Sequence, residues 1–100
     1  GCLWVDKGGH KAPLRKLFLK QNGKMEMITL NSTPFEKTDT ALEVKKGSLI
    51  LLHGRLPHYS CENKSKKSRH AFTFHIIDGN AYYSSKNWLQ RPSLPLNGFI

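Results

Sequence analysis

The sequence predicts an all-β fold, either a β-sandwich or part of a jelly roll. Short apolar runs alternate with turn residues along most of the chain. Helical periodicity is confined to one place, where Leu14, Leu17 and Phe18 share a helical face. The 100 residues are 38% hydrophobic, which suits one small domain with a modest core. Many short strands with little helix are typical of sandwiches and jelly rolls.

The N-terminal half begins with the apolar run Cys2–Val5, which we expect to form a short strand. Leu14–Phe18 predicts one or two helical turns, and the alternating stretch Lys24–Leu30 predicts a strand. Turns are marked by glycine, proline and asparagine at Gly8-Gly9, Pro13 and Asn22-Gly23.

The C-terminal half predicts four further strands, namely Ala41–Val44, Ser48–His53, His58–Ser60 and Arg69–Ile77. The continuous apolar run Ser48–His53 suits a strand buried on both faces. Residues 61–68 form a charged loop, and residues 79–100 an ordered tail bounded by prolines. We expect four aromatic side chains to lie in the core: Trp4, Phe72, Phe74 and Trp88.

The formal net charge of +9 favours an anionic partner, either a macromolecule or a small molecule. The lysines are scattered and do not alternate with aromatic residues, so we expect no nucleic-acid partner. No apolar run approaches about 18 residues, so we expect no membrane partner either. The lysines at 64, 66 and 67 form a solvated loop or attract an anionic substrate such as an acyl-CoA.

The cysteines and the chain ends indicate the compartment and the domain organisation. Two cysteines without a C-x-x-C motif suit a reduced intracellular compartment, which we expect to be the cytoplasm. The last residues are not a peroxisomal S-K-L signal. The chain has no initiator methionine and begins within an expected strand, so we expect a fragment without its N-terminal part.

Three residues of the predicted hairpin at 58–77 form the candidate site. Side chains alternate faces along a strand, so His58 and Ser60 share a face. If the loop 61–68 closes the hairpin symmetrically, Ser60 lies opposite Arg69, and directly opposed residues point to the same side. A neutral imidazole binds metals, and an arginine with a hydroxyl can hold a carboxylate. The trio would therefore seat a metal-chelating dicarboxylate.

Alternatives remain open at this point. A histidine on a strand is more often structural than a ligand, and Arg69 could be an ordinary surface residue. The 2-His-1-carboxylate iron site needs a second histidine and a carboxylate, usually as His-x-Asp or His-x-Glu. None of the five histidines is followed by that pattern. The missing pair is therefore expected before Gly1, and the rival prediction is a non-catalytic basic β-sandwich that binds anionic partners.

Two segments resemble the C-terminal half of the phytanoyl-CoA dioxygenase family. They are "GSLILLHGRLPHYSCENKSKKSRHAFTFH", followed by "NWLQRP", and "GCLWVDKGGH". In the latter, Lys7 stands where the family usually has proline, and Gly9 where it has serine. The resemblance is weak over residues 11–40, which are a variable loop in such proteins.

The resemblance implies a double-stranded β-helix, the jelly-roll fold of the cupins, of which residues 1–100 would be the C-terminal part of a single domain. It implies an enzyme that uses Fe(II) and 2-oxoglutarate to hydroxylate a small-molecule substrate. By position, His58 becomes the distal iron ligand. Arg69 would pair with the C5 carboxylate of 2-oxoglutarate, and Ser60 would hydrogen-bond to the same carboxylate.

Overall fold

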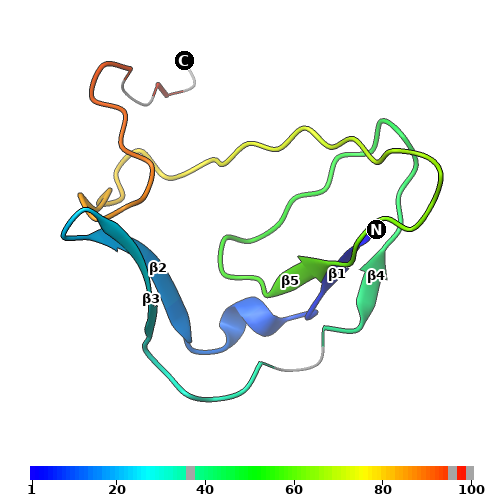
Figure 1. The fold of residues 1–100 in the computed structure, drawn as a ribbon, viewed down its shortest axis with the longest axis horizontal. Coiled ribbons are helices and arrows are strands. Elements are labelled where there is room, and N and C mark those ends of the chain that lie inside the picture. Colours follow the sequence, from blue (N-terminus) through cyan, green and yellow to red (C-terminus); the bar gives the residue numbers. More distant parts are fainter. Residues whose placement is uncertain (36–37, 95–96, 99–100) are drawn as a thin grey trace. The chain divides into compact units, whose positions relative to one another are not determined.

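The computed structural model describes residues 1–35, 38–94 and 97–98, and these divide into two compact units. The first unit comprises Gly1–Arg15 and Asn31–Ala71, and the second comprises Lys16–Leu30 and Phe72–Ile100. Apart from one three-residue 3₁₀ helix, the regular structure of the described residues is all strand. The all-β prediction is therefore confirmed (Figure 1).

A three-stranded antiparallel sheet forms the first unit, in the order β4-β1-β5. Its strands are β1 (Leu3–Val5), β4 (Thr40–Leu42) and β5 (His58–Ser60). Val5 on the central strand is buried, with 5% of its surface exposed. On the opposite face, the rings of Trp4 and Tyr59 stack with centroids 6.4 Å apart. The strand expected from the apolar run Cys2–Val5 therefore forms, with Val5 buried on one face and Trp4 half-buried on the other.

The turn after β1 contains the 3₁₀ helix η1 (Gly9–Lys11). Gly8 precedes it with φ of 91°, a left-handed conformation that favours glycine. A Cβ atom on Gly9 would collide with the carboxylate of Asp6 and lie 2.9 Å from Cδ of Pro57. The left-handed backbone thus favours glycine at position 8, and the close approach of Asp6 and Pro57 favours glycine at position 9.

A hairpin of β2 (Lys16–Gln21) and β3 (Lys24–Thr29) forms the regular part of the second unit. Asn22 and Gly23 connect the strands with φ of 50° and 77°, as a two-residue type I′ turn requires. Leu19 is buried, and the backbone N–H of Lys20 donates to the carbonyl of Lys86 in the tail at 2.8 Å. The hairpin and the tail are thereby joined.

The predicted helical turn at Leu14–Phe18 is wrong, because this stretch enters strand β2. The Asn22-Gly23 turn folds the chain back so that Leu17 pairs with Ile28 and Phe18 with Met27. Six paired positions satisfy the backbone of both strands. A helical repeat of only three apolar residues does not outweigh that pairing.

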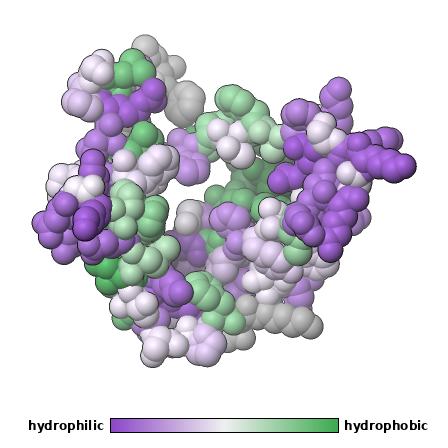
Figure 2. Space-filling view, viewed as in Figure 1, coloured by the Kyte–Doolittle hydropathy of each residue, from purple (hydrophilic) through white to green (hydrophobic). Residues whose placement is uncertain are grey.

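Two of the predicted strands do not form: Ser48–His53 and Arg69–Ile77 have no strand structure. A strand needs a neighbour for its backbone hydrogen bonds, and no described strand pairs with either segment. Their side chains are correspondingly uncovered, with Leu51 exposed to 81% and Phe72 to 90%. Phe72, Phe74 and Trp88 are therefore not core residues, contrary to expectation, and Figure 2 shows apolar residues at the surface.

Candidate functional site

Strand β5 carries the first two candidate residues, His58 and Ser60. Their positions two apart place both side chains on one face of the sheet, as predicted. The antiparallel register sets His58 opposite Val5 and Ser60 opposite Leu3 on the central strand. Both candidate side chains are exposed. The sheet thus exposes an imidazole and a hydroxyl side by side on one face.

The imidazole of His58 is oriented by the chain directly before it. Its Nδ1 lies 2.8 Å from the carbonyl oxygen of Leu56. A carbonyl only accepts hydrogen bonds, so Nδ1 is the nitrogen that donates its proton. In the neutral ring, Nε2 then keeps a free lone pair, which is the form that binds metal ions. The donor chemistry and orientation of His58 therefore fit a metal ligand.

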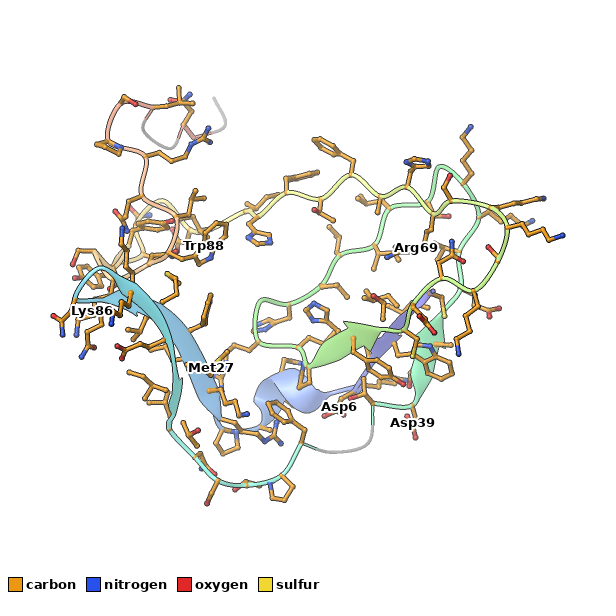
Figure 3. The ribbon with its side chains drawn as sticks, viewed as in Figure 1. Asp6, Met27, Asp39, Arg69, Lys86 and Trp88 are labelled. Carbon is orange, nitrogen blue, oxygen red and sulfur yellow. The ribbon has the colours of Figure 1, made fainter. Side chains whose placement is uncertain are left out.

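Arg69 is not placed opposite Ser60, and the predicted hairpin register is wrong. Strand β5 pairs with β1 instead, and Arg69 lies in an irregular segment (Figure 3). The loop before it is held by Asn63, whose Nδ2 donates to the carbonyl of Lys67 at 2.6 Å. The Oδ1 of Asn63 accepts from the backbone N–H and the hydroxyl of Ser65. The loop folds on itself rather than closing a symmetrical hairpin.

Two segments that sequence reasoning left aside meet next to His58. Nη2 of Arg55 donates to the carbonyl of Ala12 at 2.6 Å, and the N–H of Asp6 donates to the carbonyl of Pro57 at 3.1 Å. We call these two hydrogen bonds the latch, because they join residues 53–57 to residues 6–12. The signals for it in the sequence are slight: a proline directly before His58 and the Gly8-Gly9 pair.

The surroundings of the site supply no complete metal centre within the described residues. Nowhere in residues 1–35, 38–94 and 97–98 do three histidine, cysteine, aspartate or glutamate side chains gather to hold a metal ion. Within these residues, His58 is therefore not part of a group of three such side chains. A cavity of about 360 Å³ in the second unit is lined by Tyr83, Leu89, Gln90, Arg91 and Pro92, none of them a candidate residue.

The basic loop after β5 is solvated. Lys64 pairs with Glu62 at 3.2 Å, but both side chains are more than 70% exposed, so this ion pair adds little stability. Lys66 and Lys67 are exposed as well. Both cysteines, Cys2 and Cys61, are free thiols. No helix of the described residues is long and apolar enough to cross a membrane.

Comparison with known proteins identifies relatives of the chain. The family model described as "Phytanoyl-CoA dioxygenase (PhyH)" matches residues 1–71, a range that includes all three candidate residues. A Caenorhabditis elegans protein named "Phytanoyl-CoA dioxygenase domain-containing protein 1 homolog" is 52% identical over 98 residues, which are 90% of this chain and 34% of that protein. "Phytanoyl-CoA dioxygenase 1" of rice is 40% identical over 99 residues, 96% of this chain and 35% of that protein.

A third relative, the Danio rerio "Phytanoyl-CoA dioxygenase domain-containing protein 1", is 36% identical over 95 residues, 90% of this chain and 33% of that protein. The chain therefore spans about a third of the length of the curated relatives it matches. No solved structure matches it.

Proposed function

Because this chain belongs to the phytanoyl-CoA dioxygenase family, we propose that it is the C-terminal part of a jelly-roll dioxygenase dependent on Fe(II) and 2-oxoglutarate. The observation that supports this most is the state of His58. Its Nδ1 is engaged by the Leu56 carbonyl, so Nε2 is free for a metal, and Ser60 shares its face. The proposal includes an intracellular location and a small-molecule substrate for the complete enzyme.

In this proposal His58 holds the iron through Nε2, and Arg69 with Ser60 holds the C5 carboxylate of 2-oxoglutarate. The guanidinium fork offers two parallel N–H donors to a carboxylate, and the hydroxyl of Ser60 adds a third. Among the described strands, β5 is an edge strand of its sheet. Arg69 belongs to the same unit as β5, and in this proposal its segment lies along that open edge in the complete domain, which would bring Arg69 next to Ser60.

The bound iron and cosubstrate would supply the activation of O2 that hydroxylation requires. The residues of this chain have the tasks of binding and orientation. Ser60 and Arg69 hold the far end of the dicarboxylate, so that its chelating end is directed at the metal beside His58. Pairing that carboxylate with the Arg69 guanidinium would also select against monocarboxylic keto acids.

The two remaining iron ligands lie, in this proposal, in sequence outside residues 1–100. The relatives are about three times as long as the chain, which leaves room for a His-x-Asp pair on another strand. The relatives' name makes an acyl-CoA one candidate substrate. A net charge of +9 suits such an anionic molecule.

Isothermal titration of 2-oxoglutarate into the complete iron-loaded protein tests this assignment. We expect Arg69→Ala to weaken binding by roughly 30- to 200-fold, because a charge-assisted bidentate pair to one carboxylate is lost, at about 2–3 kcal/mol. Lys67→Ala is the matched control, since it removes a neighbouring exposed cation from the same stretch. Equal affinities of the two variants would overturn the role of Arg69.

A further inference from the structure

The backbone that orients His58 is anchored on both sides of Leu56. The residue before Leu56 is Arg55, whose guanidinium is tied to the Ala12 carbonyl. The residue after it is Pro57, whose carbonyl accepts the N–H of Asp6. Both anchors belong to the latch, and both end on residues 6–12. The Leu56 carbonyl, which accepts from Nδ1 of His58, stands between them.

We propose that Arg55 is a positioning residue for His58, acting through the latch. This inference rests on the proposed role of His58 as an iron ligand. The latch fixes the direction of the Leu56 carbonyl, and that carbonyl fixes the direction of Nε2 through the hydrogen bond to Nδ1. Arg55 therefore influences the metal without touching it.

The backbone on both sides of the Leu56 carbonyl has little conformational freedom of its own. The ring of Pro57 locks its own φ near −65°. The residue before a proline is restricted to extended conformations, so Leu56 has little freedom as well. The dipeptide Leu56-Pro57 can then move mainly as a piece. Its attachment to residues 6–12 decides where that piece sits relative to β5.

The partner side of the latch is itself tightly packed. Pro57 Cδ lies against Gly9, where only a hydrogen atom fits, and this holds the proline over the turn. The rings of His10 and His53 lie 4.9 Å apart and add a second contact between the two segments. Within segment 53–57, the N–H of Leu56 donates to the carbonyl of His53 at 2.9 Å. Arg55 thus ties a preformed loop to a preformed turn.

The size of the expected effect follows from the distance to the metal. Losing the direct hydrogen-bond partner of a metal-bound histidine typically costs 10- to 100-fold in metal affinity. Arg55 acts one step further away, so we expect a loss at or below the lower end of that range, about 3- to 10-fold. Arg55 is exposed and ends no strand, so its replacement should leave the fold in place.

Co(II) binding to the complete protein, followed by the visible absorption of the bound ion, measures this effect. Arg55→Met keeps the apolar stem and removes the donor, and we expect it to weaken Co(II) binding about 3- to 10-fold. Arg55→Lys can still donate to the Ala12 carbonyl and should restore most of the affinity. Lys45→Met is the matched control, because it removes an exposed cation from outside the latch.

The ¹⁵N chemical shifts of the His58 ring give a second readout that a purely structural role would not move. Wild type and Arg55→Lys should show a proton on Nδ1, and Arg55→Met a mixture of tautomers. If Arg55→Met does not fold, the same measurements are made on Arg55→Gln, whose side chain is too short to reach the Ala12 carbonyl. A folded variant with wild-type Co(II) affinity and tautomer would overturn the inference.

The variant His58→Ala separates the two proposals. If it leaves Co(II) binding unchanged, the metal role of His58 fails, and the inference about Arg55 fails with it. If it abolishes Co(II) binding while Arg55→Met leaves the affinity unchanged, the role of His58 stands and the positioning role of Arg55 fails.

Discussion

His58 owes its orientation to a partner only two residues away, the Leu56 carbonyl. The period of a strand was enough to predict that His58 and Ser60 share a face, because alternation needs no distant contact. The latch could not be predicted in the same way. Arg55 and Ala12 are 43 positions apart, so their hydrogen bond depends on how the chain folds back.

The close packing around Gly9 predicts that adding a single methyl group there lowers the stability of the fold. We expect Gly9→Ala to lower the free energy of unfolding by about 1–3 kcal/mol, because the new Cβ meets Asp6 and Pro57. Gly54→Ala is the matched control, since a Cβ there has no neighbour within 4 Å. Because alanine has less conformational freedom than glycine in the unfolded chain, Gly54→Ala should leave the free energy of unfolding unchanged or raise it by up to about 1 kcal/mol.

Urea unfolding of the two variants, followed by tryptophan fluorescence, provides the measurement. Trp4 lies on β1, two residues before Asp6, whose N–H donates to the carbonyl of Pro57, so its signal reports on this region. Equal stability of Gly9→Ala and Gly54→Ala would show that the turn is not closely packed against Pro57.

At the scale of the strands, local signals predicted well and non-local ones did not. The apolar run at β1, the Asn22-Gly23 turn and the alternation before Thr29 each specify structure within a few residues. The segments Ser48–His53 and Arg69–Ile77 have strong β propensity but no partner among the described strands. Strand propensity largely reflects packing against neighbours, so it cannot be realised without them.

The loop after β5 separates the proposed enzyme from its rival, a binding-only basic sandwich. We expect the combined change of Lys64, Lys66 and Lys67 to glutamine to leave 2-oxoglutarate turnover within about two-fold of wild type. These side chains are exposed, and at 0.15 M salt charges are screened within about 8 Å. Initial rates of the complete protein with saturating substrate provide the comparison.

The rival function predicts a different outcome for the same variant. Binding to an anionic polymer such as heparin should then be strong, fall steeply with added salt, and weaken when the three lysines are neutralised. That result, together with 2-oxoglutarate turnover absent from the complete protein, would favour the basic sandwich over the dioxygenase.

At the scale of the whole molecule, the described residues bury little. Val5 and Leu19 are the buried hydrophobic residues in the part of the chain that the structure describes, while Leu51 and Phe72 are largely exposed. Each unit has its own small sheet. The relatives are about three times as long as this chain. In the proposed function, the rest of the family domain packs over these apolar segments and buries them.

The central claim is that His58 is an iron ligand of a 2-oxoglutarate dioxygenase. It is tested most directly by measuring succinate formed from 2-oxoglutarate by the complete protein with Fe(II), O2 and an acyl-CoA. We expect turnover in wild type, a loss of at least about 100-fold in His58→Ala, because the metal loses a ligand, and wild-type turnover in His70→Ala. His70 is an exposed histidine whose Nε2 is already engaged by Ser68. Succinate formation by His58→Ala at the wild-type rate would contradict the account.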